Sequence, residues 1–367
     1  MMRAYAQRPE REQFAAPAGV PATLGVTEKS QRTHAQREGP TMVEAHGVRA
    51  MRAGGPEVLE YGPIEVGAPG PGEILVEVRA AGINFIDTYR RSGVYPMDYP
   101  HTVGVEGSGV VAQVGEGVTA WSAGDRVAWH DAAGSYATHV IVRADKAMRA
   151  PEGVDFESAA AIPLQGLTAQ YLVTGSHRVE PGQTALVHAA AGGVGLLLVQ
   201  LIKHLGGTVI GTVSTEEKAE LARAAGADHV FLYGDGVDVA QTVLDLTDGR
   251  GVDVAYDGVG KDTFDASLKA TAVRGSVVLF GGASGQVPPF DIQRLNGEGG
   301  VFLSRPSLVW FVRTPEELAE RSEMLFDGLS NRWLDFRVGQ SFPLTDAAEA
   351  HRALEGRRTT GKVVVTV

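Results

Sequence analysis

The segment 183–206, QTALVHAAAGGVGLLLVQLIKHLG, constrains the fold more than any other part of the chain. A short apolar run at 184–188 is followed by a turn of small residues and a longer apolar run at 195–205, which predicts a strand, a tight turn and a helix. Ala189, Gly192 and Gly195 recur at intervals of three. Residues without bulky side chains let the backbone approach a pyrophosphate bound at the helix N-terminus. We therefore expect a dinucleotide site, although such turns also occur in α/β proteins that bind nothing.

The residues that follow the next predicted strand indicate which dinucleotide is bound. That strand, 208–213, ends at Ser214, 19 residues after Gly195, where such a fold meets the adenosine ribose. An NAD site would place Asp or Glu here, whereas Ser214, Thr215 and Lys218 suit a 2′-phosphate. NADPH is therefore the expected cofactor. Ser214 can at the same time cap the next helix in a capping box with Glu217, and Lys218 can equally be a solvated helix residue.

Composition excludes several classes of function. The 367 residues, 44% of them hydrophobic, can bury a large core and predict two domains. A net charge of −11 disfavours nucleic acid as a partner. No run approaches the roughly 18 apolar residues of a membrane span, and the N-terminus lacks a secretory signal, so we expect a cytoplasmic protein without a membrane partner. The absence of cysteine excludes disulfides, thiolate nucleophiles and zinc sites built on sulfur.

The N-terminal part of the chain predicts a tail and then a β-rich domain. Residues 1–41 show no sustained apolar periodicity and are expected to form a disordered tail, and Met42 is a hypothetical alternative start of translation. Short strands separated by glycine are predicted at 73–79, 109–114, 125–129 and 136–142. Within them, 82–96 is interpreted as a polar loop, rich in aromatic residues, of the kind that lines binding sites.

Helices and strands alternate in the second part. A helical segment at 156–174, broken at Pro163 and Gly166, precedes them. Predicted strands lie at 184–188, 208–213, 229–232, 252–257, 276–280 and 301–303, and helices at 195–205, 216–225, 237–246 and 262–271. This order predicts a parallel sheet covered on both faces, with ligands at the carboxyl ends of its strands. Thr314, Pro315 and Glu317 predict a capped helix start, followed by a short strand, a helix at 346–355 and a strand at 362–367 that returns to the N-terminal domain.

Five segments together resemble the zinc-free quinone oxidoreductases, the zeta-crystallin-like NADPH:quinone reductases of the medium-chain dehydrogenase/reductase superfamily. They are AAGINFIDTYRRSGVYP at 80–96, GVEGSGVV at 104–111, HAAAGGVG at 188–195, GTVSTEEK at 211–218 and SRPSL at 304–308. The resemblance implies an α/β fold, with a Rossmann-type doubly wound parallel sheet at 168–305 and a β-rich, GroES-like catalytic domain at 42–167 and 306–367. It also implies a homodimer formed through the edge strand near Val301.

The resemblance also implies chemistry without a metal. Zinc-dependent relatives carry a cysteine where this chain has Asn84, a histidine where it has Val105, and a four-cysteine lobe that is missing here. Without a Lewis acid to polarise a carbonyl group, hydride delivery to an electron-poor acceptor such as a quinone is the expected reaction. Whether electrons pass as a pair or singly, and which acceptor is natural, stays open.

By the same resemblance, candidate site residues can be assigned. Asn84, Tyr89, Tyr95 and Thr168 are the candidate catalytic residues. Lys218, Tyr233 and Arg357, with Arg358 as an alternative to Arg357, are expected around the 2′-phosphate. The full set of candidate NADPH contacts is Phe85, Ile86, Asp87, Thr88, Tyr89, Tyr171, Gly192, Gly193, Val194, Ser214, Thr215, Lys218, Tyr233, Gly258, Phe280, Gly281, Arg305, Pro306, Ser307 and Arg357.

Two alternative functions remain open from the sequence. One is an enoyl-thioester reductase of the same superfamily, in which Tyr95 donates a proton after hydride transfer. The other is a non-catalytic NADPH- or RNA-binding protein of the zeta-crystallin type, which the acidic net charge disfavours.

Overall fold

Six parallel strands form the sheet that the alternating pattern predicts. The computed structural model describes residues 42–234, 236–356 and 358–367, so the predicted tail and Arg357 lie outside the described residues. The strand order is β11-β10-β9-β12-β13-β14, and every neighbouring pair is parallel. From β9 the chain first adds β10 and β11 on one side and then β12, β13 and β14 on the other, so the direction in which strands are added reverses beside β9. This is the strand that leads into the glycine turn. The strands are β9 (Thr184–Val187), β10 (Thr208–Val213), β11 (His229–Leu232), β12 (Val252–Asp257), β13 (Thr271–Leu279) and β14 (Phe302–Ser304).

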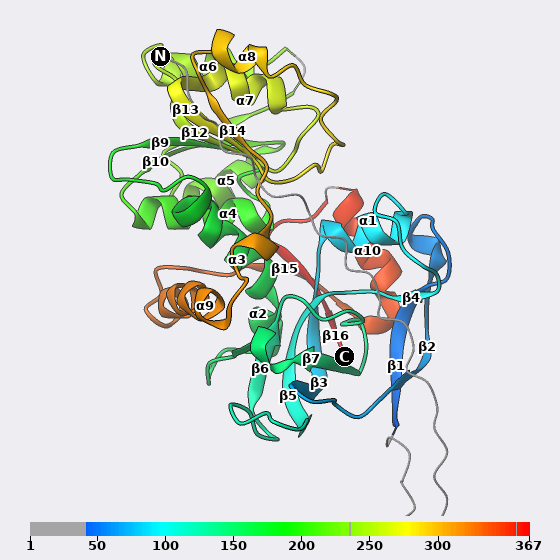
Figure 1. Cartoon of the computed structure of the whole chain (residues 1–367). Helices are drawn as coiled ribbons and strands as arrows, with labels where there is room; N and C mark the ends of the chain where they lie inside the picture. The colour runs from blue at the N-terminus through cyan, green and yellow to red at the C-terminus, as the bar shows by residue number, and fades with distance from the viewer. Residues whose placement is uncertain (1–41, 235, 357) are drawn as a thin grey trace, which may run out of the picture. The chain divides into compact units, whose positions relative to one another are not determined.

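Helices cover both faces of this sheet, as predicted. Figure 1 shows α4 and α5 on one side of it and α6 and α7 on the other. One core contains Val187 with Leu198 of α4, whereas its neighbour Leu186 packs in a separate core with Val243 of α6 and Leu268 of α7. Alternate residues of a strand point to opposite faces, so a strand buried on both sides is apolar throughout. The helices are α4 (Gly193–His204), α5 (Glu216–Ala224), α6 (Val239–Leu246), α7 (Phe264–Ala270) and α8 (Gln293–Gly297).

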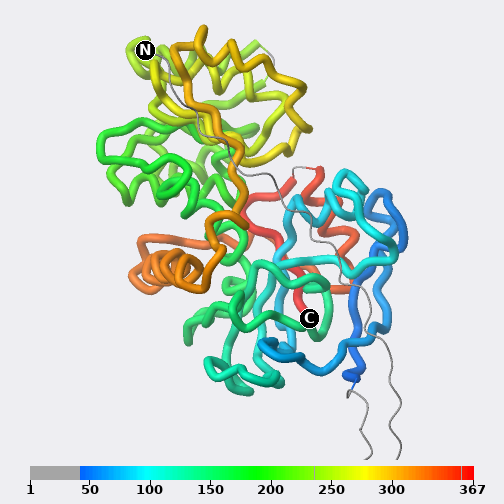
Figure 2. Tube along the Cα trace, viewed as in Figure 1, coloured from blue at the N-terminus to red at the C-terminus, as the bar shows by residue number. Residues whose placement is uncertain are grey.

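The remaining strands form a seven-stranded and a three-stranded sheet. The larger sheet has the order β15-β16-β3-β5-β6-β8, with β7 paired to β3, and the smaller has the order β2-β1-β4. The C-terminal strand β16 pairs antiparallel with β3, so the last segment returns to the N-terminal sheet as predicted; Figure 2 shows it in red beside the cyan strand. The strands are β1 (Val43–Ala50), β2 (Leu59–Val66), β3 (Glu73–Ile83), β4 (His101–Thr102), β5 (Glu106–Val114), β6 (Arg126–Trp129), β7 (His139–Arg143), β8 (Ala147–Arg149), β15 (Val338–Pro343) and β16 (Lys362–Thr366).

Helices α2 (Phe156–Ala161) and α3 (Pro163–Tyr171) follow β8 in the chain and precede β9. The predicted break at Pro163 is confirmed, whereas Gly166 lies inside α3, where it packs against Leu325 and Phe336 instead of ending the helix. The predicted cap at Thr314 is also confirmed as a capping box that starts α9 (Pro315–Ser330). A π-helical turn (Leu172–Ser176) and α10 (Ala347–Glu355) complete the longer elements. In the described ranges, no helix is both long and apolar enough to cross a membrane.

The interpretation of 82–96 as a loop was wrong. Residues Phe85–Ser92 form α1, which begins in a capping box between Asn84 and Asp87 and ends at Gly93 in the left-handed conformation, with φ of 81°. Both end signals are visible in the sequence as Asn-x-x-Asp and, nine residues after Asn84, a glycine. The loop was predicted from the many aromatic and polar residues of the segment, and these two end signals were not considered.

The predicted cap of α5 was shifted by one residue. Thr215, not Ser214, is the N-cap, and its hydroxyl accepts a hydrogen bond from the Lys218 amide at 3.3 Å. The capping box between Ser214 and Glu217 is therefore absent, and Ser214 lines a cavity instead.

Candidate functional site

The turn after β9 presents backbone amides at the start of α4. Ala189 adopts the left-handed conformation, with φ of 50°, and Gly192 is an N-cap without a side-chain hydrogen bond. No acidic residue occupies the first turn of α4. A Cβ atom on Gly195 would lie 2.3 Å from the carbonyl oxygen of Ala189, so only glycine permits this approach. Unpaired amides at a helix N-terminus favour a bound anion.

A cavity of about 220 Å³ opens at this turn. Ser214 follows β10 and Tyr233 follows β11, so both lie at the carboxyl ends of strands, and Lys218 of α5 joins them. The predicted residues that line this cavity are Asn84, Phe85, Gly192, Gly193, Val194, Ser214, Lys218, Tyr233, Gly258 and Phe280.

A second cavity, of about 280 Å³, shares part of its lining with the first. The shared residues are Asn84, Phe85, Gln165, Val194, Gly258, Phe280 and Ala283. The further predicted residues that line it are Ile86, Tyr89, Tyr95, Thr168, Tyr171, Gly281, Arg305, Pro306 and Ser307. Among the residues that the structure describes, no Asp or Glu lines either cavity. The two cavities therefore form one site that is free of negative charge along its described walls.

Aromatic rings form one wall of the second cavity. Tyr89 lies 6.1 Å from Phe85 and meets Tyr95 edge-to-face at 5.5 Å, measured between ring centroids. Tyr171 stacks on Phe311 at 4.4 Å. A planar ligand can pack against such rings over a large area.

The hydroxyls of Tyr89 and Tyr171 stay protonated at neutral pH. Burial raises the pKa of Tyr89, and Tyr95 raises it further, whereas Arg305 opposes the shift. Burial also raises the pKa of Tyr171. The guanidinium of Arg305 donates to the carbonyl oxygens of Phe280 and Pro306, each at 3.1 Å. The cavity thus combines neutral hydroxyl donors with the positive charge of Arg305.

Three predicted contacts do not line either cavity. Asp87 is buried in α1, where its carboxylate accepts from the Asn84 amide at 2.9 Å and from the Tyr136 hydroxyl at 3.0 Å. Thr88 donates to the carbonyl oxygen of Phe85 at 2.8 Å, and Thr215 caps α5. Arg358 is described but lines neither cavity.

A buried cluster of charge lies directly behind Asn84. Lys362 of β16 forms an ion pair with Glu106 of β5, and both also bond the Asn84 side chain. Sequence reasoning missed Glu106 and Lys362 as site residues. Each is a charged residue at the start of a strand, β5 and β16, and this was the available signal, since such residues are buried only when paired.

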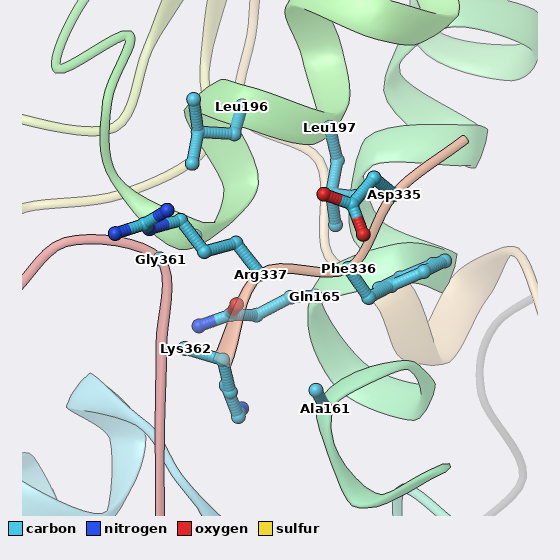
Figure 3. A pocket seen from close by; sticks show the side chains of 10 residues that line it. Ala161, Gln165, Leu196, Leu197, Asp335, Phe336, Arg337, Gly361 and Lys362 are labelled. Atoms are coloured by element: carbon cyan, nitrogen blue, oxygen red, sulfur yellow. The ribbon is translucent and has the colours of Figure 1, made fainter. Parts of the chain in front are cut away.

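Gln165 and His188 were also missed. Gln165 lines both cavities and a smaller one behind the turn, where Figure 3 shows it together with Lys362. His188, in the wall of the first cavity, lies 3.0 Å from the hydroxyl of Thr212 and 3.0 Å from that of Ser267, which donates to Asp257 at 2.8 Å. Burial lowers the pKa of His188, so the ring stays neutral and ties β9 to β10 and α7.

The described ranges contain no group of three or more His, Cys, Asp or Glu side chains that could hold a metal ion.

Comparison with known proteins gives consistent similarities. Residues 70–182 match the family model of the alcohol dehydrogenase GroES-like domain, and residues 193–317 match that of the zinc-binding dehydrogenase domain. The chain is 46% identical to a quinone oxidoreductase of Pseudomonas aeruginosa over 85% of its own length and 96% of that protein. It is 41% identical to a 2-haloacrylate reductase of Burkholderia over 86% of its own length and 96% of that protein. The structure of an Escherichia coli quinone oxidoreductase complexed with NADPH superimposes with a TM-score of 0.85 at 41% identity, covering 88% of this chain and 100% of that one.

Proposed function

The chain belongs to the quinone oxidoreductases of the medium-chain dehydrogenase/reductase superfamily, and from this premise we infer that its two joined cavities hold NADPH and a quinone side by side. The protein is an NADPH-dependent quinone oxidoreductase. The observation that supports the arrangement is the shared lining, in which seven residues border both cavities. Two ligands that share a wall can react directly, since binding holds their reacting atoms close together.

The residues of the first cavity fit NADPH. Amides at the start of α4 would hold the pyrophosphate, and Ser214, Lys218 and Tyr233 would surround the 2′-phosphate. The absence of Asp and Glu from the described lining agrees with a ligand that carries several negative charges. When bound, NADPH supplies the hydride that reduces the quinone.

The residues of the second cavity would orient the acceptor. Tyr89 and Tyr95 offer ring faces on which a flat quinone can pack, and their hydroxyls can donate hydrogen bonds to its carbonyl oxygens. Arg305 adds a positive charge that favours the negative charge developing on those oxygens. Thr168 offers another hydroxyl at the same wall. The protein therefore contributes mainly position and electrostatic stabilisation.

Turnover is proposed to need no metal ion. Quinones are already electron-poor, so hydride transfer to them does not require a Lewis acid, and the chain has no cysteine to supply thiolate ligands.

Steady-state kinetics test this function. Purified protein should oxidise NADPH with 1,4-benzoquinone or 9,10-phenanthrenequinone faster than it oxidises NADH, and dialysis against EDTA should leave the rate unchanged. Failure to reduce any quinone with either cofactor would contradict the assignment. Loss of activity with EDTA and recovery with Zn²⁺ would contradict only the metal-free mechanism.

A second candidate activity is reduction of a carbon–carbon double bond conjugated to a carboxyl or thioester group. The 41% identity to a 2-haloacrylate reductase favours it. Arg305 would bind the carboxylate, and Tyr95, the proton donor expected from the sequence, would supply the proton. Including 2-chloroacrylate and crotonyl-CoA in the same panel measures it directly.

The domain division, the oligomeric state and the location in the cell are proposed on the same basis. The division into a domain of residues 42–167 with 306–367 and a domain of 168–305 follows the family. A homodimer would form along β14, an edge strand in which Phe302 is 66% exposed; Val273 of the neighbouring β13 is 73% exposed. Light scattering of the protein and of a Phe302→Arg variant tests the dimer. A cytoplasmic location, without nucleic acid or membrane as partner, completes the proposal.

A further inference from the structure

We propose that Lys362 is a positioning residue that, together with Glu106, locks the carboxamide of Asn84 in one orientation beside both ligands. This inference rests on the function proposed above. It assigns a role to a buried ion pair that touches neither cavity described there but bonds a side chain that lines both of them.

The hydrogen bonds of the cluster allow one orientation of the amide. Lys362 Nζ donates to Asn84 Oδ1 at 2.7 Å, and Asn84 Nδ2 donates to Glu106 Oε2 at 2.7 Å. Lys362 also donates to Glu106. An ammonium group can only donate and a carboxylate can only accept. Turning the amide over would set its NH₂ group against the ammonium and its oxygen against the carboxylate, so both charges oppose the reversed state.

The cluster is packed too tightly for water to take over these bonds. Lys362 is 2% exposed and Glu106 is fully buried. A Cβ atom on Gly82 would lie 2.2 Å from Glu106 Oε2 and 2.7 Å from Lys362 Cε, so the backbone of β3 lies directly against the pair. The second carboxylate oxygen of Glu106 accepts from the Leu164 amide at 2.5 Å. Each partner of Asn84 is thus itself held in place.

The same cluster joins the segments that form the wall between the cavities. Asn84 precedes α1, which carries Phe85; Leu164 lies in the first turn of α3, beside Gln165; and Lys362 begins β16, next to Gly361. Phe85 and Gln165 line both cavities, and Gly361 lines the first. A buried ion pair adds little net stability because desolvation offsets the attraction. Its effect here is to present a fixed amide dipole to the ligands.

A double variant separates this role from a purely structural one. Lys362→Met leaves Glu106 buried without its cation, so it should lower both the melting temperature and kcat/KM. Lys362→Met/Glu106→Gln removes both charges, and a glutamine can bond either orientation of Asn84. We expect its melting temperature to recover toward that of the wild type while kcat/KM stays about ten-fold or more below it. Recovery of kcat/KM together with stability would overturn the proposal, as would full activity in Lys362→Met.

A second double variant keeps Lys362 and exchanges the other two groups. In Asn84→Asp/Glu106→Gln, the net charge of the cluster is preserved, Lys362 still donates to residue 84, and the bond between residues 84 and 106 reverses its direction. Lys362 loses its acceptor at residue 106, and a carboxylate replaces the amide at the cavity wall. This protein should fold with a modestly lower melting temperature and show a reduced kcat with quinone, with weaker binding of NADPH. Wild-type kcat and affinity would overturn the proposal, even where Lys362→Met and its double variant do not fold.

Two readouts keep the outcomes distinct. NADPH affinity is measured by fluorescence titration of each protein, independently of turnover. If the wild type binds NADPH but reduces no quinone, the proposed function fails, whereas the affinities of the variants still decide the role of Lys362. If the wild type turns over and both double variants match it in kcat/KM and affinity, only the role of Lys362 fails.

Discussion

Replacement of Gly195 by alanine should damage the cofactor turn in proportion to the crowding measured there. The new Cβ atom would lie 2.3 Å from the carbonyl oxygen of Ala189 and 2.9 Å from the Cα atom of Ala190, whereas ordinary contacts begin at 3.4 Å. These neighbours are backbone atoms of the turn, so α4 or the turn must shift by about 1 Å. Overpacking of this kind costs about 1–3 kcal/mol, which for a chain of this size predicts a melting temperature lower by about 1–4 °C.

The same shift should weaken cofactor binding, since it displaces the amides at the start of α4. A displacement of about 1 Å can reduce kcat/KM by about ten- to hundred-fold. Differential scanning fluorimetry and NADPH fluorescence titration measure the two effects. Gly192→Ala is the matched control: its Cβ atom meets only the Ala189 oxygen, at 3.1 Å, and its φ of −76° suits any residue. Equal, small effects in both variants would refute the reasoning.

Three further predictions concern charge. Ser214→Asp should lower NADPH affinity about ten-fold or more and raise that for NADH, because its carboxylate repels a 2′-phosphate. Its control, Thr215→Ala, removes the α5 cap and should cost about 1 kcal/mol of stability while the NADPH/NADH ratio of kcat/KM stays constant. Burial raises the pKa of Asp87 from 3.8 to about 6. Between about pH 4 and pH 6 the unfolded chain has released this proton while the native state still holds it, so the free energy of unfolding falls by about 3 kcal/mol as the pH rises across this range. Asp87→Asn should abolish this loss in melting curves recorded across that range; an unchanged slope would contradict the burial argument. Finally, Arg91→Met should lower the melting temperature by several degrees, since Glu355 loses its partner at 2.6 Å and the Gly54 carbonyl loses its donor; an unchanged melting temperature would show that the pair adds nothing.

The parallel sheet could be predicted because its signals are local. Each strand is a short apolar run, and the turn at Gly192 and Gly195 has the spacing that close approach requires. The strands at 208–213, 229–232 and 252–257 were predicted with the observed bounds. Periodicity and glycine spacing depend on neighbours in sequence, so a single sequence suffices for them.

The helix α1 shows where local signals compete. Asn84, Asp87 and Gly93 mark its two ends, but Tyr89 and Tyr95 gave the segment the composition of a binding loop. Ser214 illustrates the same competition on a smaller scale, since Ser214 and Thr215 are both good caps and only the path of the backbone decides between them.

The charge cluster behind Asn84 depends on contacts between distant parts of the chain. Lys362 and Asn84 are 278 positions apart, and Lys362 and Glu106 are 256 apart. No periodicity connects them, so sequence spacing gives no indication that they meet. The resemblance to a family located Asn84 in the site but not the pair that holds it.

The position of β16 has a consequence for biosynthesis. This strand lies between β15 and β3, inside the seven-stranded sheet, although Lys362 at its start is 278 positions from Asn84, which follows β3. During translation the sheet therefore keeps a gap between β3 and β15 until residues 362–366 have been made. A nonsense codon at Lys362 would leave an open sheet edge and no lysine behind Asn84.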